Sequence, residues 1–228
     1  MKLAILGTGV VGQTLAAKLA TLGHDVALGT RDPAATLARD QPDGFGNPPM
    51  SAWAAAHPTV AVRTLADAAA HGEVVVNALA GRVSVEGVTA AGADHLAGKI
   101  LIDASNPLDF SRGMPPSLTV CNTDSLAEQL QRALPKTRVV KALNTVSAPL
   151  MVDPSRLAGG DHTMFVSGDD ADARRQVAGY LREWFGWRDV LELGDLSTAR
   201  GTEMYLPLWI RTWMATGSPL FSVKVVRG

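Results

Sequence analysis

Three glycines near the start of the chain have the spacing of a phosphate-binding turn. The run Gly7-Thr8-Gly9-Val10-Val11-Gly12 matches the pattern G-x-G-x-x-G. In this pattern the first glycine permits a tight turn, the second lets a pyrophosphate approach the backbone, and the third lets the following helix pack closely on the strand. The free N–H groups and partial positive charge of a helix N-terminus favour a bound phosphate there. We therefore expect a dinucleotide site at this turn.

A second pair of residues indicates which dinucleotide the turn would bind. In an NAD enzyme the second strand ends in an Asp or Glu that bonds the ribose 2′-hydroxyl, but here Thr30-Arg31 stands at that place. An Arg fork and a Thr hydroxyl can hold a 2′-phosphate by charge-assisted hydrogen bonds. Asp32 follows directly and, with Pro33 after it, has the pattern of a helix N-cap. The sequence therefore predicts NADP(H) rather than NAD(H).

The hydrophobic pattern predicts that alternating strands and helices position these residues. An apolar strand precedes the glycine turn, and apolar residues at helical spacing follow it. Continuous apolar runs separated by helical stretches indicate a parallel sheet covered on both faces. We expect an α/β fold, a Rossmann-type doubly wound parallel sheet, that binds its ligands at the carboxyl ends of the strands. The predicted strands are 3–6, 25–29, 60–62, 74–79, 100–103 and 139–143.

The rest of the chain predicts a smaller second part. Residues 1–150 would form the NADP-binding Rossmann domain, and residues 151–228 a small C-terminal α/β lobe that covers a second-ligand site. This lobe would contain strands at 162–166 and 189–193, and helices at 171–184 and about 202–215. The segment 41–58 is rich in Pro and Gly, so only a short helix at 51–56 is expected within it.

Small and amide residues follow three of the predicted strands, where a planar ring could lie close to the backbone. Asn106 and Asn144 also fit a turn role through local hydrogen bonds. Lys141, inside an apolar strand, could act as a base if burial lowered its pKa, or could form an ion pair or a backbone contact. No catalytic residue is predicted. The cofactor-binding residues that we predict are Gly7, Thr8, Gly9, Val10, Val11, Gly12, Thr30, Arg31, Ala78, Leu79, Asn106, Pro107, Asn144 and Ala148.

Groups that often carry catalysis are missing from the sequence. Neither tyrosine has a lysine four residues later, so the Tyr-Lys pair of short-chain dehydrogenases is absent. The five histidines lack metal-ligand spacing, and no metal is expected. Hydride transfer between two redox cofactors mainly needs alignment and exclusion of water. A missing acid–base pair therefore fits that reaction.

Composition limits the partners of the chain. Its 228 residues, 46% hydrophobic and 19% charged, carry a formal net charge of −1. This balance offers no basic field for nucleic acid or an anionic membrane. No apolar segment reaches the roughly 18 residues that span a bilayer. Cys121, the only cysteine, excludes an internal disulfide. We expect a cytoplasmic protein.

The motifs together resemble a known family, the NADP oxidoreductases dependent on coenzyme F420, a deazaflavin hydride carrier. The resemblance covers essentially the whole chain and is carried by the opening 1–12, Thr30-Arg31, 105–108 and 141–145. It implies reversible hydride transfer between NADP(H) and a deazaflavin, commonly in homodimers. It also implies that the glycine turn holds the pyrophosphate and that Thr30-Arg31 holds the 2′-phosphate.

Two other readings of the sequence remain open. The chain could be an NADPH-dependent reductase of a flavin, a quinone, an imine or a small carbonyl compound. It could also be a non-catalytic module that senses NADP(H) and reports redox state to a partner. In each case the partner beside the dinucleotide would be a small molecule or a regulated protein, with no nucleic acid or membrane.

Overall fold

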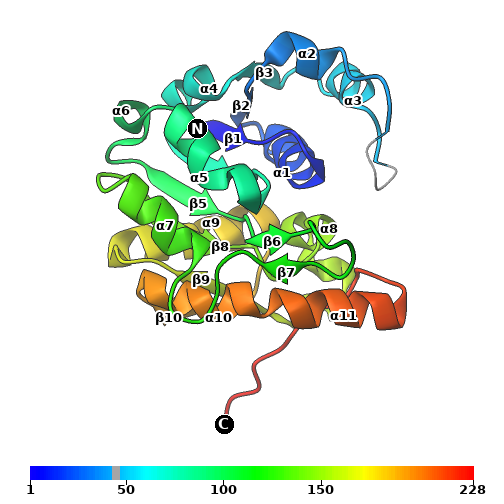
Figure 1. Ribbon diagram of the computed structural model, residues 1–228, viewed down its shortest axis with the longest axis vertical. Coiled ribbons are helices and arrows are strands. Elements are labelled where there is room, and N and C mark those ends of the chain that lie inside the picture. Colours follow the sequence, from blue (N-terminus) through cyan, green and yellow to red (C-terminus); the bar gives the residue numbers. More distant parts are fainter. Residues whose placement is uncertain (43–46) are drawn as a thin grey trace.

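A single eight-stranded sheet forms the centre of the computed structural model, which describes residues 1–42 and 47–228 (Figure 1). Its strand order is β10-β9-β8-β5-β4-β1-β2-β3. The six strands from β3 to β8 follow the 3-2-1-4-5-6 order of Rossmann folds, which confirms the predicted fold class. The strands are β1 (Lys2–Leu6), β2 (Asp25–Thr30), β3 (Ala61–Thr64), β4 (Val74–Asn77), β5 (Ile100–Asp103), β8 (Arg138–Ala142), β9 (Thr163–Ser167) and β10 (Asp189–Gly194).

Helices cover both faces of the sheet (Figure 1). Buried residues of α1 (Val10–Thr21), α3 (Met50–Ala56), α8 (Ala148–Val152) and α9 (Ala171–Phe185) form one apolar core. A second core contains residues of α4 (Leu65–His71), α5 (Gly81–Ala90), α6 (Ala93–Leu96), α7 (Leu126–Ala133) and α10 (Ala199–Met204). The remaining helices are α2 (Pro33–Leu37) and α11 (Leu206–Thr216), with single 3-10 turns at Pro154–Arg156, Ala158–Gly160 and Leu196–Thr198.

Side chains of the central strand β1 divide between the two cores. Leu3 and Ile5 pack into the first core, and Ala4 and Leu6 pack into the second. All four residues are fully buried. Because side chains of a strand alternate between its faces, a strand covered on both sides is apolar at every position. This packing explains the uninterrupted apolar runs in the sequence.

The C-terminal part of the chain extends the same sheet. Strand β9 pairs antiparallel with β8, Lys141 lying opposite Ser167 and Ala142 opposite Val166, and β10 then pairs parallel with β9. The strands predicted at 162–166 and 189–193 are thus confirmed within a residue or so. The sheet continues across residue 150, and the division into 1–150 and 151–228 stays a prediction.

Other predicted elements differ in detail from the structure. The expected last helix is two helices, α10 and α11, that meet at Tyr205. Pro207 has no N–H to donate to the preceding turn, and its ring crowds that turn, so a continuous helix is interrupted there. The strand predicted at 139–143 ends at Ala142, because Leu143 has a φ of 68°.

A short hairpin was missed by sequence analysis. Its strands β6 (Leu108–Asp109) and β7 (Ser117–Leu118) have two residues each, too few for an alternation pattern. The short helix expected at 51–56 is confirmed as α3, whereas residues 43–46 of the same segment lie outside the described residues. Among the described residues, no helix is long and apolar enough to cross a membrane.

Candidate functional site

The glycine turn between β1 and α1 leaves no room beneath it and open space above it. The Gly7 N–H donates to the Gly29 carbonyl at 2.9 Å, and Gly7 has a φ of 119°. A Cβ atom at Gly12 would lie 1.9 Å from the Gly7 carbonyl oxygen, whereas a Cβ at Gly9 would meet nothing within 4 Å. Gly12 therefore serves the packing of helix on turn, and Gly9 leaves the backbone accessible to a ligand.

The N-terminus of α1 has the character of an anion site. Its N-cap is Gly9, and no side chain caps it by a hydrogen bond. The N–H groups of the first turn have no intrahelical acceptor, and the helix dipole favours negative charge beside them. These features fit the pyrophosphate of a dinucleotide.

A cavity of about 350 Å³ extends from this turn to the end of β2. It is lined by Gly7 and Thr8 on one side, and by Thr30 and Arg31 on the other. Arg31 is exposed and has no hydrogen bond or ion pair with another described residue, so its guanidinium is available to a phosphate. Asp32 accepts a hydrogen bond from the Ala35 N–H at 2.9 Å, which confirms it as the N-cap of α2.

The structure adds a second cation that sequence analysis missed. Arg39 lines the same cavity, and its Nη2 atom donates to the Thr8 hydroxyl at 2.7 Å. Thr36 also lines it and shares a hydrogen bond of 2.8 Å with the Thr30 hydroxyl. Besides Asp32, which caps α2, one other described carboxylate borders the cavity, that of Glu86 on α5. Two guanidinium groups and three threonine hydroxyl groups, together with two carboxylates, thus line the cavity expected to hold the 2′-phosphate.

A second cavity of about 760 Å³ lies on the other side of the glycine turn. Its lining contains the start of α1, the loop between β4 and α5, the residues after β5, and the β6–β7 hairpin up to Phe110 and Ser111. Leu79 borders both cavities. Much of the wall is small or apolar. Its charged members are Arg82 and Asp109.

The predicted site residues separate into three groups. The first cavity takes Gly7, Thr8, Thr30 and Arg31, and the second takes Gly9, Val10, Val11, Ala78 and Asn106, while Leu79 touches both. Gly12 lies beneath the turn. Pro107, Asn144 and Ala148 are buried and do not line either cavity in the described part of the chain.

Asn144 is held by other protein groups. Its side-chain amide donates to the Asn106 Oδ1 atom at 3.0 Å and to the Thr202 carbonyl at 3.1 Å. Asn106 returns a bond from Nδ2 to the Asn144 carbonyl at 2.9 Å. The two asparagines therefore tie the loops after β5 and β8 together, behind the wall of the second cavity.

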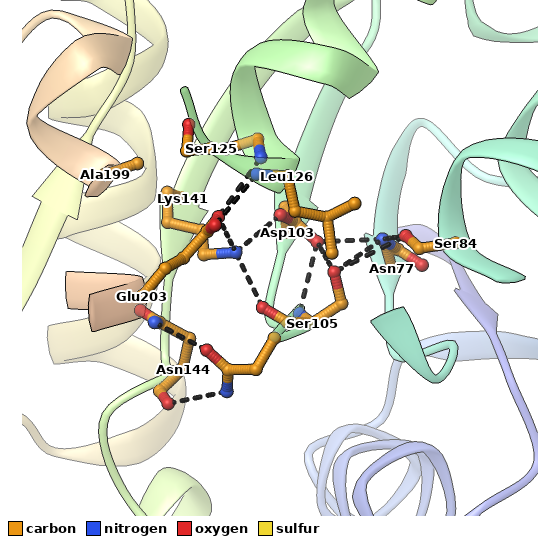
Figure 2. A network of polar contacts seen from close by, with 12 residues as sticks. Asn77, Ser84, Asp103, Ser105, Ser125, Leu126, Lys141, Asn144, Ala199 and Glu203 are labelled. Carbon is orange, nitrogen blue, oxygen red and sulfur yellow. Dashed lines mark hydrogen bonds and ion pairs between the residues drawn. The ribbon is translucent and has the colours of Figure 1, made fainter. Parts of the chain in front are cut away.

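Lys141 is the centre of a buried polar network (Figure 2). Its Nζ atom lies 2.8 Å from a carboxylate oxygen of Asp103 and 2.8 Å from one of Glu203. Burial acts to lower the pKa of Lys141, but the charges of the two carboxylates outweigh it, and the pKa is raised above its usual value. The proposal of a lysine base with a lowered pKa is therefore wrong, and the ion-pair alternative is confirmed.

Comparisons with known proteins agree with this geometry. Residues 2–107 match the model of the family described as NADP oxidoreductase, coenzyme F420-dependent. The F420-dependent NADP reductase of Methanothermobacter thermautotrophicus is 33% identical over 217 residues, which cover 92% of this chain and 88% of that protein. The chain belongs to this family. It is an NADP-dependent oxidoreductase.

Two further relatives show how far the similarity reaches. The crystal structure of a protein from Arthrobacter sp. FB24, assigned as an F420-dependent NADP reductase, has 57% identity and a TM-score of 0.94, and the two chains cover each other completely. Rat metalloreductase STEAP3 is 30% identical over 95% of this chain, which spans only 39% of that protein's length. This oxidoreductase therefore shares its whole fold with the bacterial protein and matches a minor part of STEAP3.

The described residues of this oxidoreductase contain no cluster of His, Cys, Asp or Glu that could hold a metal ion. Its single cysteine, Cys121, is exposed and free. The charged groups that line the two cavities in the described part of the chain are three arginines and three carboxylates, namely Arg31, Arg39, Arg82, Asp32, Glu86 and Asp109, beside hydrogen-bonding groups and small apolar residues.

Proposed function

We propose that the chain transfers hydride between NADPH and a deazaflavin acceptor of the F420 type. The dinucleotide would lie over the glycine turn, with its 2′-phosphate between Arg31 and Arg39 in the first cavity. The acceptor would occupy the second cavity. NADPH supplies the hydride when bound, so the protein has to align the two rings and keep water away from them.

The shape and lining of the second cavity carry this proposal. At about 760 Å³ it is within the range of cavities that take a drug-sized molecule. Ala78, Ala80, Gly81 and Ala104 offer a low wall on which a flat ring system can lie. A carbonyl reduction would need a positioned proton donor, and among the described lining residues only Arg82 and Asp109 are charged. Hydride transfer into a conjugated ring delocalises the charge, and the one proton that balances the reduction can come from solvent, so a positioned donor is not required.

The family relatives support the same acceptor. The curated proteins of two Methanothermobacter species that match this chain are F420-dependent NADP reductases, at 33% and 30% identity. Solved imine reductases and reductive aminases match at 20% identity or less and share the fold alone. Acceptor identity, the homodimer and the cytoplasmic location all stay predictions.

The direct test mixes the protein with NADPH and oxidised F420 and follows the deazaflavin absorbance. We expect this absorbance to fall catalytically. In the reverse reaction, which starts from NADP⁺ and reduced F420, we expect the absorbance to rise. No exchange at high enzyme concentration would exclude this acceptor. Turnover with a flavin, a quinone or an imine would then favour another reductase activity. Tight NADPH binding without any turnover would favour a sensing module.

A matched pair of variants separates the two cavities. Ala80 and Ala90 are both exposed and lie at opposite ends of α5, Ala80 in the wall of the second cavity and Ala90 in that of the first. Ala80→Trp would fill acceptor space, so we expect F420 reduction to be lost while NADPH still binds. Ala90→Trp should instead weaken NADPH binding. The proposed placement is wrong if the two variants behave alike.

A further inference from the structure

Three charged side chains are completely enclosed between the sheet and α10 (Figure 2). Lys141 on β8, Asp103 on β5 and Glu203 on α10 are each exposed by 1% or less. The Lys141 ammonium group donates to Asp103 Oδ2 at 2.8 Å and to the Ser105 carbonyl at 2.6 Å, and it contacts Glu203 Oε1 at 2.8 Å. An ammonium group has three protons to donate, so all of them are engaged.

The two carboxylates are engaged as completely as the ammonium. Asp103 Oδ1 accepts bonds from Asn77 Nδ2 at 2.8 Å, from the Ser105 N–H at 3.1 Å and from the Ser105 hydroxyl at 2.6 Å. Glu203 accepts the N–H groups of Leu126 at 2.8 Å and Ala127 at 3.1 Å, in the first turn of α7. Fully satisfied buried networks rigidify their surroundings.

Ser105 connects this network to the acceptor side of the site. Its carbonyl is held by Lys141, its N–H and hydroxyl are held by Asp103, and the residue lines the second cavity. The next residue has no freedom to move toward α5, because a Cβ at Gly81 would lie 1.9 Å from the Asn106 carbonyl oxygen. A displacement of Ser105 would therefore change the wall against which the acceptor lies.

The network also reaches the wall that separates the two cavities. Asn77, which bonds Asp103, accepts the Leu79 N–H on its side-chain oxygen at 3.2 Å. Leu79 borders both cavities. Both the residues after β4 and those after β5 thus take their positions from one charged centre.

Stability alone does not account for such a centre. The cost of taking charges out of water offsets most of their attraction, so a buried ion pair is a weak source of stability compared with apolar packing. Its directional bonds do, however, specify one arrangement of the loops that they hold. A displacement of about 1 Å in a reacting pair can lower a rate about 100-fold, so an arrangement of this kind matters at a hydride-transfer site.

We propose that Lys141, clamped between Asp103 and Glu203, is a positioning residue that holds Ser105 and thereby the shape of the second cavity. This inference rests on the proposed function, because it assigns that cavity to the hydride acceptor. Glu203, which holds Lys141 from the other side, lies on α10 in the C-terminal part of the chain. The C-terminal part would therefore also help to position Ser105.

The test removes the lysine and its distal partner together. In Lys141→Met/Glu203→Gln the net charge is unchanged, and Asp103 keeps its three neutral donors. We expect NADPH affinity to stay at the wild-type level, the kcat for F420 reduction to fall about 100-fold, and hydrogen exchange to rise in a peptide covering 104–111. Glu203→Gln alone keeps the side-chain shape and should show the same split to a smaller degree, which maintains the test if the double variant does not fold.

The control is a second carboxylate that joins the same two helices. Glu128 on α7 binds Arg200 on α10 through bonds of 2.9 and 2.6 Å and does not line either described cavity. Glu128→Gln should leave kcat and exchange at 104–111 unchanged. Wild-type kcat and wild-type exchange in a folded Lys141 or Glu203 variant would overturn the proposal. If the wild-type protein does not reduce F420, the proposed function fails, and the exchange measurement still decides whether Lys141 holds Ser105.

Discussion

The glycine turn allows two single-methyl substitutions, three residues apart, to have opposite consequences. In Gly12→Ala the new Cβ would lie 1.9 Å from the Gly7 carbonyl oxygen, and real Cβ contacts do not fall below 3.0 Å. That carbonyl would have to retreat by about 1 Å, although its residue is tied to Gly29. Overpacking of this kind costs about 1–3 kcal/mol. At this chain length, about 2 kcal/mol corresponds to a fall in Tm of about 4–8 °C.

Gly9→Ala should leave the fold intact and impair binding. Gly9 has φ −77° and ψ −178°, which alanine adopts without strain, and its Cβ would meet nothing within 4 Å. The methyl group would stand where the phosphates approach the backbone. We expect a Tm without ligand close to that of the wild type, because the gain of about 0.4–1 kcal/mol for Gly→Ala at a compatible site is offset by the weaker preference for alanine at an N-cap.

Thermal unfolding with and without NADPH distinguishes the two effects. A ligand at 100 times its Kd stabilises the folded protein by about 2.7 kcal/mol. Wild type should show this increment, Gly9→Ala should lose most of it, and Gly12→Ala should start from a lower Tm. A full NADPH increment in Gly9→Ala, or a wild-type Tm without ligand in Gly12→Ala, would refute the assignment of roles within the turn.

Two further predictions concern charges. Arg31→Ala should raise the Kd for NADPH about 10- to 100-fold, because a hydrogen bond to a charged group contributes about 1.5–3 kcal/mol. The same substitution should leave the Kd for NADH unchanged. If calorimetry showed equal losses of affinity for both dinucleotides, Arg31 would not be the residue that binds the 2′-phosphate. The hydrogen bonds from Arg132 lower the pKa of Asp124 from 3.8 to about 2, so this carboxylate stabilises the folded state above its unfolded pKa, and the contribution is lost as the pH falls through about 2. Urea unfolding of wild type and Asp124→Asn should therefore differ above pH 4 and converge near pH 2, and a difference independent of pH would contradict the ion pair.

Local sequence patterns were sufficient for the Rossmann unit, for the glycine turn and for the N-cap of α2. The strand at 100–103 could be predicted because burial on both faces makes a strand uniformly apolar. The helix after the glycine turn could be predicted because its apolar residues recur at helical spacing. The N-cap at Asp32 could be predicted because its partner, the Ala35 N–H, is three residues away. A feature that depends only on residues of the same turn or strand can be predicted from the sequence, without knowledge of tertiary contacts.

The remaining features depend on contacts between distant residues. Glu203 meets Lys141 across 62 positions of sequence, and Arg39 reaches Thr8 across 31. A lone Glu or Arg on a short helix has the same local pattern whether it faces solvent or a site. The direction of β9 was also beyond local reasoning, because an apolar strand has the same composition whether it runs parallel or antiparallel to its neighbour. Asn144 and Ala148 were predicted to contact the cofactor, but they are buried behind the cavity wall. Their burial also depends on contacts with residues that are distant in the sequence.

The β6–β7 hairpin gives the two halves of the site different tolerance to mutation. It closes one side of the second cavity with Leu108, Phe110 and Ser111, although its strands have only two residues each and Phe110 is 48% exposed. Substitutions there disturb little buried area, whereas in the glycine turn a Cβ at Gly7 or Gly12 would lie 2.5 or 1.9 Å from a backbone oxygen. Under the proposed assignment of the two cavities, a change of acceptor preference can therefore be engineered, or selected, in the hairpin while the dinucleotide half remains intact.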